Sequence, residues 1–91
     1  MEKELLFRRI NEEIDVVAHR RLVQSTPCAF LCECSRLDCT SAVELAREDY
    51  EAVRARPDWF LVLPGHVDPE IERIVEERPA FWVLEKRQLC A

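Results

Sequence analysis

The beginning of the chain alternates apolar and charged residues with the period of a helix. Within residues 2–23, apolar side chains recur every three or four positions, at Phe7, Ile10, Ile14 and Val17. This spacing places them on one face of a helix, which Pro27 and the residues before it are expected to end. We expect the apolar face to pack on the rest of the domain. The alternative is a seam between the helices of two copies.

Four short runs farther along have the composition of strands. Residues 28–34 are mostly apolar, and residues 40–45 alternate between apolar and polar. Residues 59–63 are aromatic and branched and lie between prolines, so they give the strongest strand signal. Residues 81–84 form the last apolar run. The sequence therefore predicts four strands.

Two further segments have the signals of helices. Residues 46–56 are rich in helix-favouring residues and end at Pro57. The segment between Asp68 and Pro79 opens with an aspartate suited to cap a helix, followed by a proline at the first helical position. Its apolar residues have helical spacing: Ile71, Ile74 and Val75. Both segments are predicted to be helices.

Together these elements predict one α+β domain over residues 1–91. Its order is helix, strand, strand, helix, strand, helix, strand. We expect a long N-terminal helix within residues 1–24, followed by an α+β core over residues 28–91. The core is expected to hold a small mixed four-stranded sheet and the two further helices.

The amino-acid composition excludes several classes of function. Among 91 residues, 13 are Lys or Arg and 18 are Asp or Glu, which gives a net charge of −5. This acidic balance argues against binding nucleic acid, and a single glycine rules out a glycine-rich phosphate loop. No apolar run is long enough for a signal peptide or a membrane span. We therefore expect a cytoplasmic protein with neither nucleic acid nor membrane as a partner.

The five cysteines carry the clearest chemical signal. Their odd number excludes a complete set of internal disulfides, and a reducing compartment favours metal binding at close spacing. Cys32, Cys34 and Cys39 form a C-x-C-x4-C pattern around a polar turn. Zn²⁺ prefers four ligands of this soft type. We expect His66, in the turn after the strongest strand, to be the fourth.

Other residues compete for that fourth position. Cys28 is the main alternative, although an extended strand would hold it roughly 13 Å from Cys32 at about 3.3 Å per residue. His19 has no partner nearby in the sequence, and Cys90 is next to the C-terminus. Without a metal, the three clustered cysteines would be ordinary buried or exposed thiols.

Three cysteines and one histidine leave no open coordination position, which favours a structural zinc site over a catalytic one. We expect a regulatory or protein-interaction module with a protein partner of unknown identity, not an enzyme. The first alternative is a thiol-based redox or metal sensor that releases zinc on oxidation. The second is a small zinc enzyme, which usually needs a carboxylate base. Glu33, Asp38 and Asp68 lie near the proposed ligands, but Asp68 is better explained as a helix cap.

Several segments also resemble a family of small uncharacterised bacterial proteins that is common in actinobacteria. The resemblance rests on Phe30-Leu31-Cys32-Glu33-Cys34 with Cys39, Tyr50-Glu51-Ala52-Val53-Arg54-Ala55, Phe60-Leu61-Val62 with Pro64-Gly65-His66, and Val83-Leu84-Glu85-Lys86. It extends to the N-terminal segment Phe7-Arg8-Arg9-Ile10-Asn11-Glu12. It implies that the three cysteines and His66 belong to one pattern. Ala46 departs from that pattern, which has threonine there.

Overall fold

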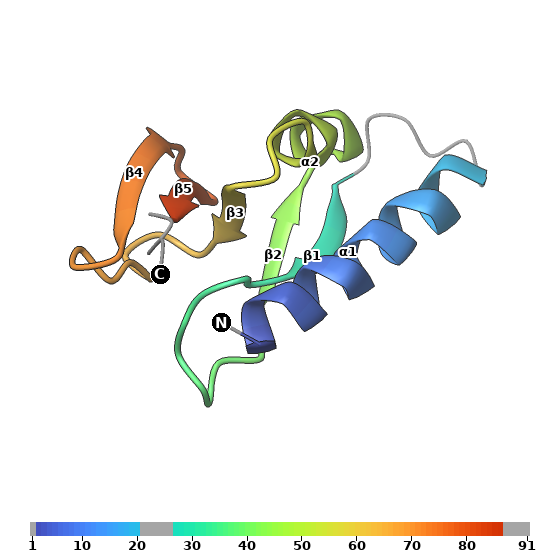
Figure 1. Ribbon diagram of the computed structural model, residues 1–91. Helices are drawn as coiled ribbons and strands as arrows, with labels where there is room; N and C mark the ends of the chain where they lie inside the picture. Colours follow the sequence, from blue (N-terminus) through green and yellow to red (C-terminus); the bar gives the residue numbers. More distant parts are fainter. Residues whose placement is uncertain (1, 21–26, 87–91) are drawn as a thin grey trace.

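The computed structural model describes the backbone of residues 2–20 and 27–86, and shows two helices and five strands there (Figure 1). In chain order they are α1 (Glu2–Arg20), β1 (Cys28–Leu31), β2 (Ala42–Leu45), α2 (Arg47–Arg54), β3 (Trp59–Val62), β4 (Glu72–Glu77) and β5 (Trp82–Lys86). All strand pairs are antiparallel. One sheet is the pair β1-β2, and the other has the order β3-β5-β4.

The expected single mixed sheet of four strands with three helices is therefore wrong. The segment between Asp68 and Pro79 is a turn followed by strand β4, not a helix. The Asp68 side chain does accept a hydrogen bond from the Glu70 amide, at 3.1 Å, as a helix cap would. Its backbone carbonyl accepts bonds from Ile71 and Glu72, and the chain then pairs with β5.

A β-bulge interrupts the alternation of β4. The register between β4 and β5 shifts between Ile74 and Glu76, which leaves Val75 as an extra residue in the ladder. An extra residue breaks the strict alternation of a strand. Within β4 the apolar residues Ile74 and Val75 are adjacent, and Ile71 lies in the turn before the strand. The helix-like spacing of these three residues therefore combines a turn residue with the bulge, and periodicity alone could not distinguish the two structures.

The two sheets meet where the chain leaves β1. The Cys32 amide donates to the Ser41 carbonyl at 2.9 Å, which continues the contact with the segment leading to β2. The next amide, that of Glu33, donates to the Leu61 carbonyl in β3 at 2.7 Å. Residues 32 and 33 thus join both sheets, and the core continues across this junction. Its buried members include Phe30, which stacks on Tyr50 of α2 with ring centroids 4.3 Å apart.

Helix α1 lies alongside β1 (Figure 1). Polar side chains form much of its buried face. Glu4, Arg8 and Asn11 are almost fully buried, whereas Val17 of the predicted apolar stripe is 50% exposed. Among the predicted stripe residues, Ile14 packs against the core. The helix is thus held mainly on a row spaced i, i+4, i+7 beside the stripe. Neither described helix is apolar enough over a sufficient length to span a bilayer.

Each buried polar residue of α1 has a specific partner. Glu4 pairs at 3.1 Å with Lys86 at the end of β5, and Lys86 also contacts Glu72 of β4. The Arg8 guanidinium donates to the Arg56 carbonyl at 3.0 Å and also to the carbonyl of Pro57. These bonds satisfy groups that would be costly to bury alone. They fix the rotation of α1 about its axis.

Candidate metal centre

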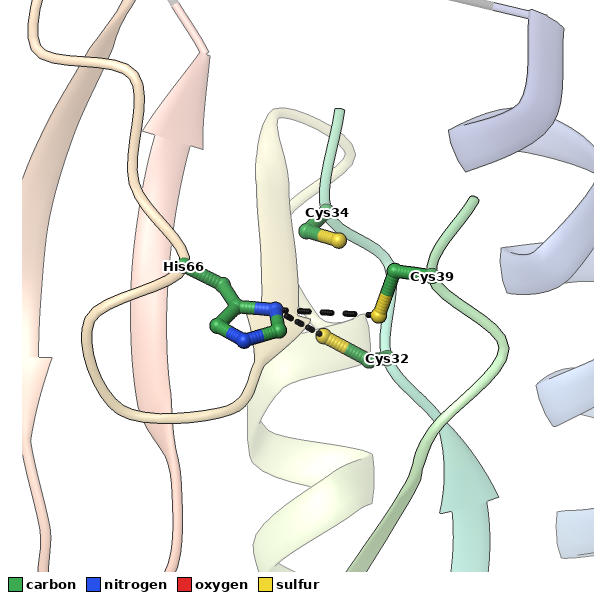
Figure 2. Close-up of side chains that lie close together, drawn as sticks. All are labelled: Cys32, Cys34, Cys39 and His66. Atoms are coloured by element: carbon green, nitrogen blue, oxygen red, sulfur yellow. Dashed lines mark hydrogen bonds between the residues drawn. The ribbon is translucent and has the colours of Figure 1, made fainter. Parts of the chain in front are cut away.

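Four predicted side chains converge beside the junction of the sheets. Cys32 and Cys34 follow β1, Cys39 precedes β2, and His66 lies in the loop after β3. Figure 2 shows the four side chains directed toward a common space. One ligand atom from each, a Cys sulfur or a His nitrogen, lies within 4.8 Å of all the others. The residues are therefore close enough together to hold one metal ion.

Local turns aim these side chains. The Cys39 amide donates to the Arg36 carbonyl at 3.3 Å and closes the turn between the second and third cysteines. On the opposite loop, Gly65 has a φ of +86°, a left-handed conformation that side chains other than glycine disfavour. The His66 amide donates back to the Leu63 carbonyl at 3.1 Å. The one glycine of the chain thus turns the loop that carries His66.

Two of the distances between ligand atoms match those of a tetrahedral site. Nδ1 of His66 lies 3.5 Å from Sγ of Cys32 and 3.6 Å from Sγ of Cys39, as the dashed lines in Figure 2 mark. With Zn–S near 2.3 Å and Zn–N near 2.05 Å, a tetrahedron separates sulfur from nitrogen by about 3.6 Å. Nδ1 is therefore the nitrogen placed to bind an ion.

Burial shifts the pKa values of two of the four side chains. Burial raises the pKa of the Cys32 thiol to about 12, opposed by the Leu63 amide and reinforced by the neighbouring thiols. Burial lowers the pKa of His66, and the positive charges of Arg36 and Lys3 lower it further. The imidazole is therefore neutral near pH 7 and offers a lone pair. A divalent cation among these sulfurs would oppose the effect of burial and stabilise the thiolates.

Two of the three sulfurs also receive a hydrogen bond from outside the cluster. The Leu63 amide donates to Sγ of Cys32 at 3.2 Å. The Lys3 ammonium lies 3.8 Å from Sγ of Cys34 and donates to the carbonyl of the same residue at 3.2 Å. Burial acts to raise the pKa of Cys39, but hydrogen bonds led by the Ser41 backbone lower it overall. Such outer contacts orient and stabilise metal-binding thiolates.

Glu33 does not serve as the base considered above. It is 1% exposed, and both carboxylate oxygens have partners: the Leu61 amide at 2.9 Å and the Asn11 side chain at 2.7 Å. Burial raises its pKa to about 7, although these two hydrogen bonds oppose the rise. Of the other two candidates, Asp38 is exposed, and Asp68 closes the turn before β4. Glu33 therefore supports the fold beside the cluster.

Asn11 was missed as a supporting residue. It is fully buried, and its amide nitrogen donates to the Leu31 carbonyl at 2.9 Å as well as to Glu33. Its side-chain oxygen accepts from the Leu31 amide at 2.7 Å. Asn11 thus holds α1 against the last residue of β1, next to Cys32. The only signal in the sequence was the i, i+4, i+7 spacing of Glu4, Arg8 and Asn11, which also fits a solvated face.

The other residues considered for the fourth ligand position are either not part of the cluster or not among the residues that the structure describes. Cys28 begins β1 and is not among the four converging residues. The side chain of His19 and the whole of Cys90 lie outside the described residues. Within residues 3–17 and 27–86, the structure brings together Cys32, Cys34, Cys39 and His66. That set offers the sulfur and imidazole donors of a metal centre.

Comparison of the chain with protein-family models, with curated proteins and with solved structures found no match. The chemistry and geometry of this cluster are therefore the guide to function.

Proposed function

We propose that this protein is a small cytoplasmic zinc-binding domain whose Zn²⁺ site is structural, and that it acts as a regulatory or protein-interaction module. The supporting observation is the convergence of three sulfurs and one imidazole nitrogen within 4.8 Å. Soft thiolate and imidazole donors in a tetrahedral arrangement suit Zn²⁺ better than the harder divalent ions. Four protein ligands also complete the coordination of zinc and leave no position for substrate.

The position of the cluster in the fold supports a structural role. Its ligands come from three separate segments: the exit of β1, the approach to β2, and the loop after β3. A metal ion bound there connects the two sheets beside the hydrogen bond from Glu33 to Leu61. Domains of this size bury little apolar surface, and metal binding then contributes a large part of their stability. The proposed ion would therefore hold the two sheets together.

The test is to measure metal content, ligand type and stability on the same purified protein. We expect native mass spectrometry to find one zinc per chain, and X-ray absorption to find three sulfurs and one nitrogen around it. Chelation should unfold the domain or lower its melting temperature strongly. Cys34→Ser should lose the metal, whereas Cys28→Ser is the matched control that keeps it. A chain that binds no zinc at neutral pH and stays folded in chelator would contradict the proposal.

The main alternative is a sensor that releases zinc when its thiolates are oxidised. It is favoured by the exposure of Pro64 and Gly65, next to the half-buried His66, which places one side of the cluster near the surface. An oxidant could reach the sulfurs from that side. Zinc release under mild peroxide, followed with a chromogenic chelator, separates the two functions. Full retention of zinc with an unchanged melting temperature would exclude the sensor.

A further inference from the structure

Helix α1 presents a second face, opposite its buried row. We call this the outer face and define it by six residues: Leu5, Leu6, Arg9, Glu13, Val16 and Val17. At about 100° per residue, they centre roughly 160° from the row of Glu4, Arg8 and Asn11. Its four apolar side chains are each 49–55% exposed, and all four are large aliphatic residues. Val16 and Val17 also line a shallow groove with Arg9 and Glu13.

The outer position of these residues is imposed by the contacts of α1 with the domain. The ion pair of Glu4 with Lys86 and the three hydrogen bonds of Asn11 with Leu31 and Glu33 all involve buried groups. Rotating α1 to bury the aliphatic side chains would break these bonds and leave charged groups in the interior. The polar row therefore holds the aliphatic side chains at the surface.

The outer face is symmetric about the level of residue 11. Two aliphatic residues lie about 9 Å and 7.5 Å before that level, and two lie at similar distances after it, at 1.5 Å per residue. Between them, Arg9 precedes the level by two residues, and Glu13 follows it by two. Within the described residues, neither Arg9 nor Glu13 forms an ion pair, and both are exposed.

From this symmetry we infer that the outer face binds a second copy of the same chain, with the two α1 helices antiparallel around a two-fold axis at residue 11. In that arrangement Leu5 faces Val16 of the other copy and Leu6 faces its Val17. Arg9 of each copy faces Glu13 of the other, so the charges attract at two equivalent contacts. A two-fold interface requires such self-complementarity, because the same patch serves both subunits.

The size of the face sets the strength of the dimer. One helical face of this length buries roughly 500 Å² per subunit, which is at the lower limit for specific interfaces. We therefore expect a reversible dimer with a dissociation constant in the micromolar range or weaker. The two Arg–Glu contacts lie between the two pairs of aliphatic residues. They are expected to select the antiparallel arrangement more than to supply affinity.

The experiment is a charge exchange read by sedimentation velocity from about 10 µM to 1 mM protein. The wild type should show a sedimentation coefficient that rises with concentration. Arg9→Glu places two pairs of like charges at the interface, and Glu13→Arg does the same with the opposite sign. Each single variant should dimerise at least about tenfold more weakly. An equimolar mixture of the two variants should recover the wild-type association, because every contact then pairs opposite charges.

A second pair of variants tests the apolar contact. Leu6→Ala should weaken the dimer, whereas Leu37→Ala is the matched control on another exposed leucine and should not. All substitutions lie on exposed positions, so circular dichroism should show an intact fold. A chain that remains monomeric at 1 mM would overturn the inference. So would a dimer that the single charge variants leave unchanged, because a different surface would then mediate it.

Discussion

The substitution Asn11→Asp tests whether the buried polar contacts of α1 stabilise the fold beside the candidate metal centre. The side chains have nearly the same shape, so the change leaves no cavity. The remaining oxygen still accepts from the Leu31 amide, but the donor that reaches the Leu31 carbonyl and Glu33 is lost. A second carboxyl group then lies against the buried Glu33. Two carboxylates at this distance cannot both be ionised without a large cost.

Two contributions to the free energy of unfolding set how much stability Asn11→Asp should cost. The Leu31 carbonyl loses its side-chain donor, and a carboxyl group replaces the neutral amide, which together cost roughly 2 kcal/mol at pH 7. The paired acids also retain a proton in the folded state that the unfolded chain has released. Glu33 alone has a pKa of about 7, and a second carboxylate beside it raises the pKa of the pair further. Stability therefore falls with rising pH, by as much as about 1.4 kcal/mol per unit.

Urea denaturation of the zinc-loaded protein at pH 7, 8 and 9 measures both contributions. In the wild type, Glu33 is ionised in both states above its pKa of about 7, so its contribution levels off toward pH 9. The variant should continue to lose stability and be roughly 4–5 kcal/mol less stable at pH 9. Glu44→Gln, at an exposed position, is the control and should change little. Parallel pH profiles for variant and wild type would refute this reasoning.

Four other substitutions test separate parts of the structure. Lys3→Ala should weaken zinc binding about tenfold in a chelator competition, because the ammonium group near Cys34 is lost; unchanged affinity would exclude that role. Lys86→Met should lower the free energy of unfolding by about 3–5 kcal/mol, because two carboxylates remain buried without their cation. Arg73→Ala, which breaks an exposed pair, should cost under about 1 kcal/mol in the same denaturation assay. Cys28→Ser should keep one zinc per chain by mass spectrometry.

Short-range sequence patterns made much of the cluster predictable. The C-x-C-x4-C pattern concerns residues so close in sequence that any tight turn brings them together. The fourth residue, His66, was predictable because the only glycine of the chain precedes it and follows a strong strand. The structure brings all four residues together, as the sequence indicated.

Long-range contacts decided the parts that the sequence did not reveal. Residues 72–77 form a strand because β5 supplies a partner ladder, and the bulge after Ile74 hid the alternation that would have indicated it. The buried row of α1 depends on distant partners such as Lys86 and Glu33. Glutamate, arginine and asparagine at helical spacing usually indicate a solvated surface, and nothing local marks these three as buried.

The separation of His66 from the cysteines has a consequence for the entropy of the unfolded chain. Cys39 and His66 are 27 residues apart in sequence. An ion that binds both closes a loop of that length, as a disulfide between them would. By the chain-entropy relation used for disulfides, such a cross-link stabilises a domain by roughly 3–4 kcal/mol. The three cysteines, by contrast, enclose only short loops, so most of this topological constraint depends on the single bond to the imidazole.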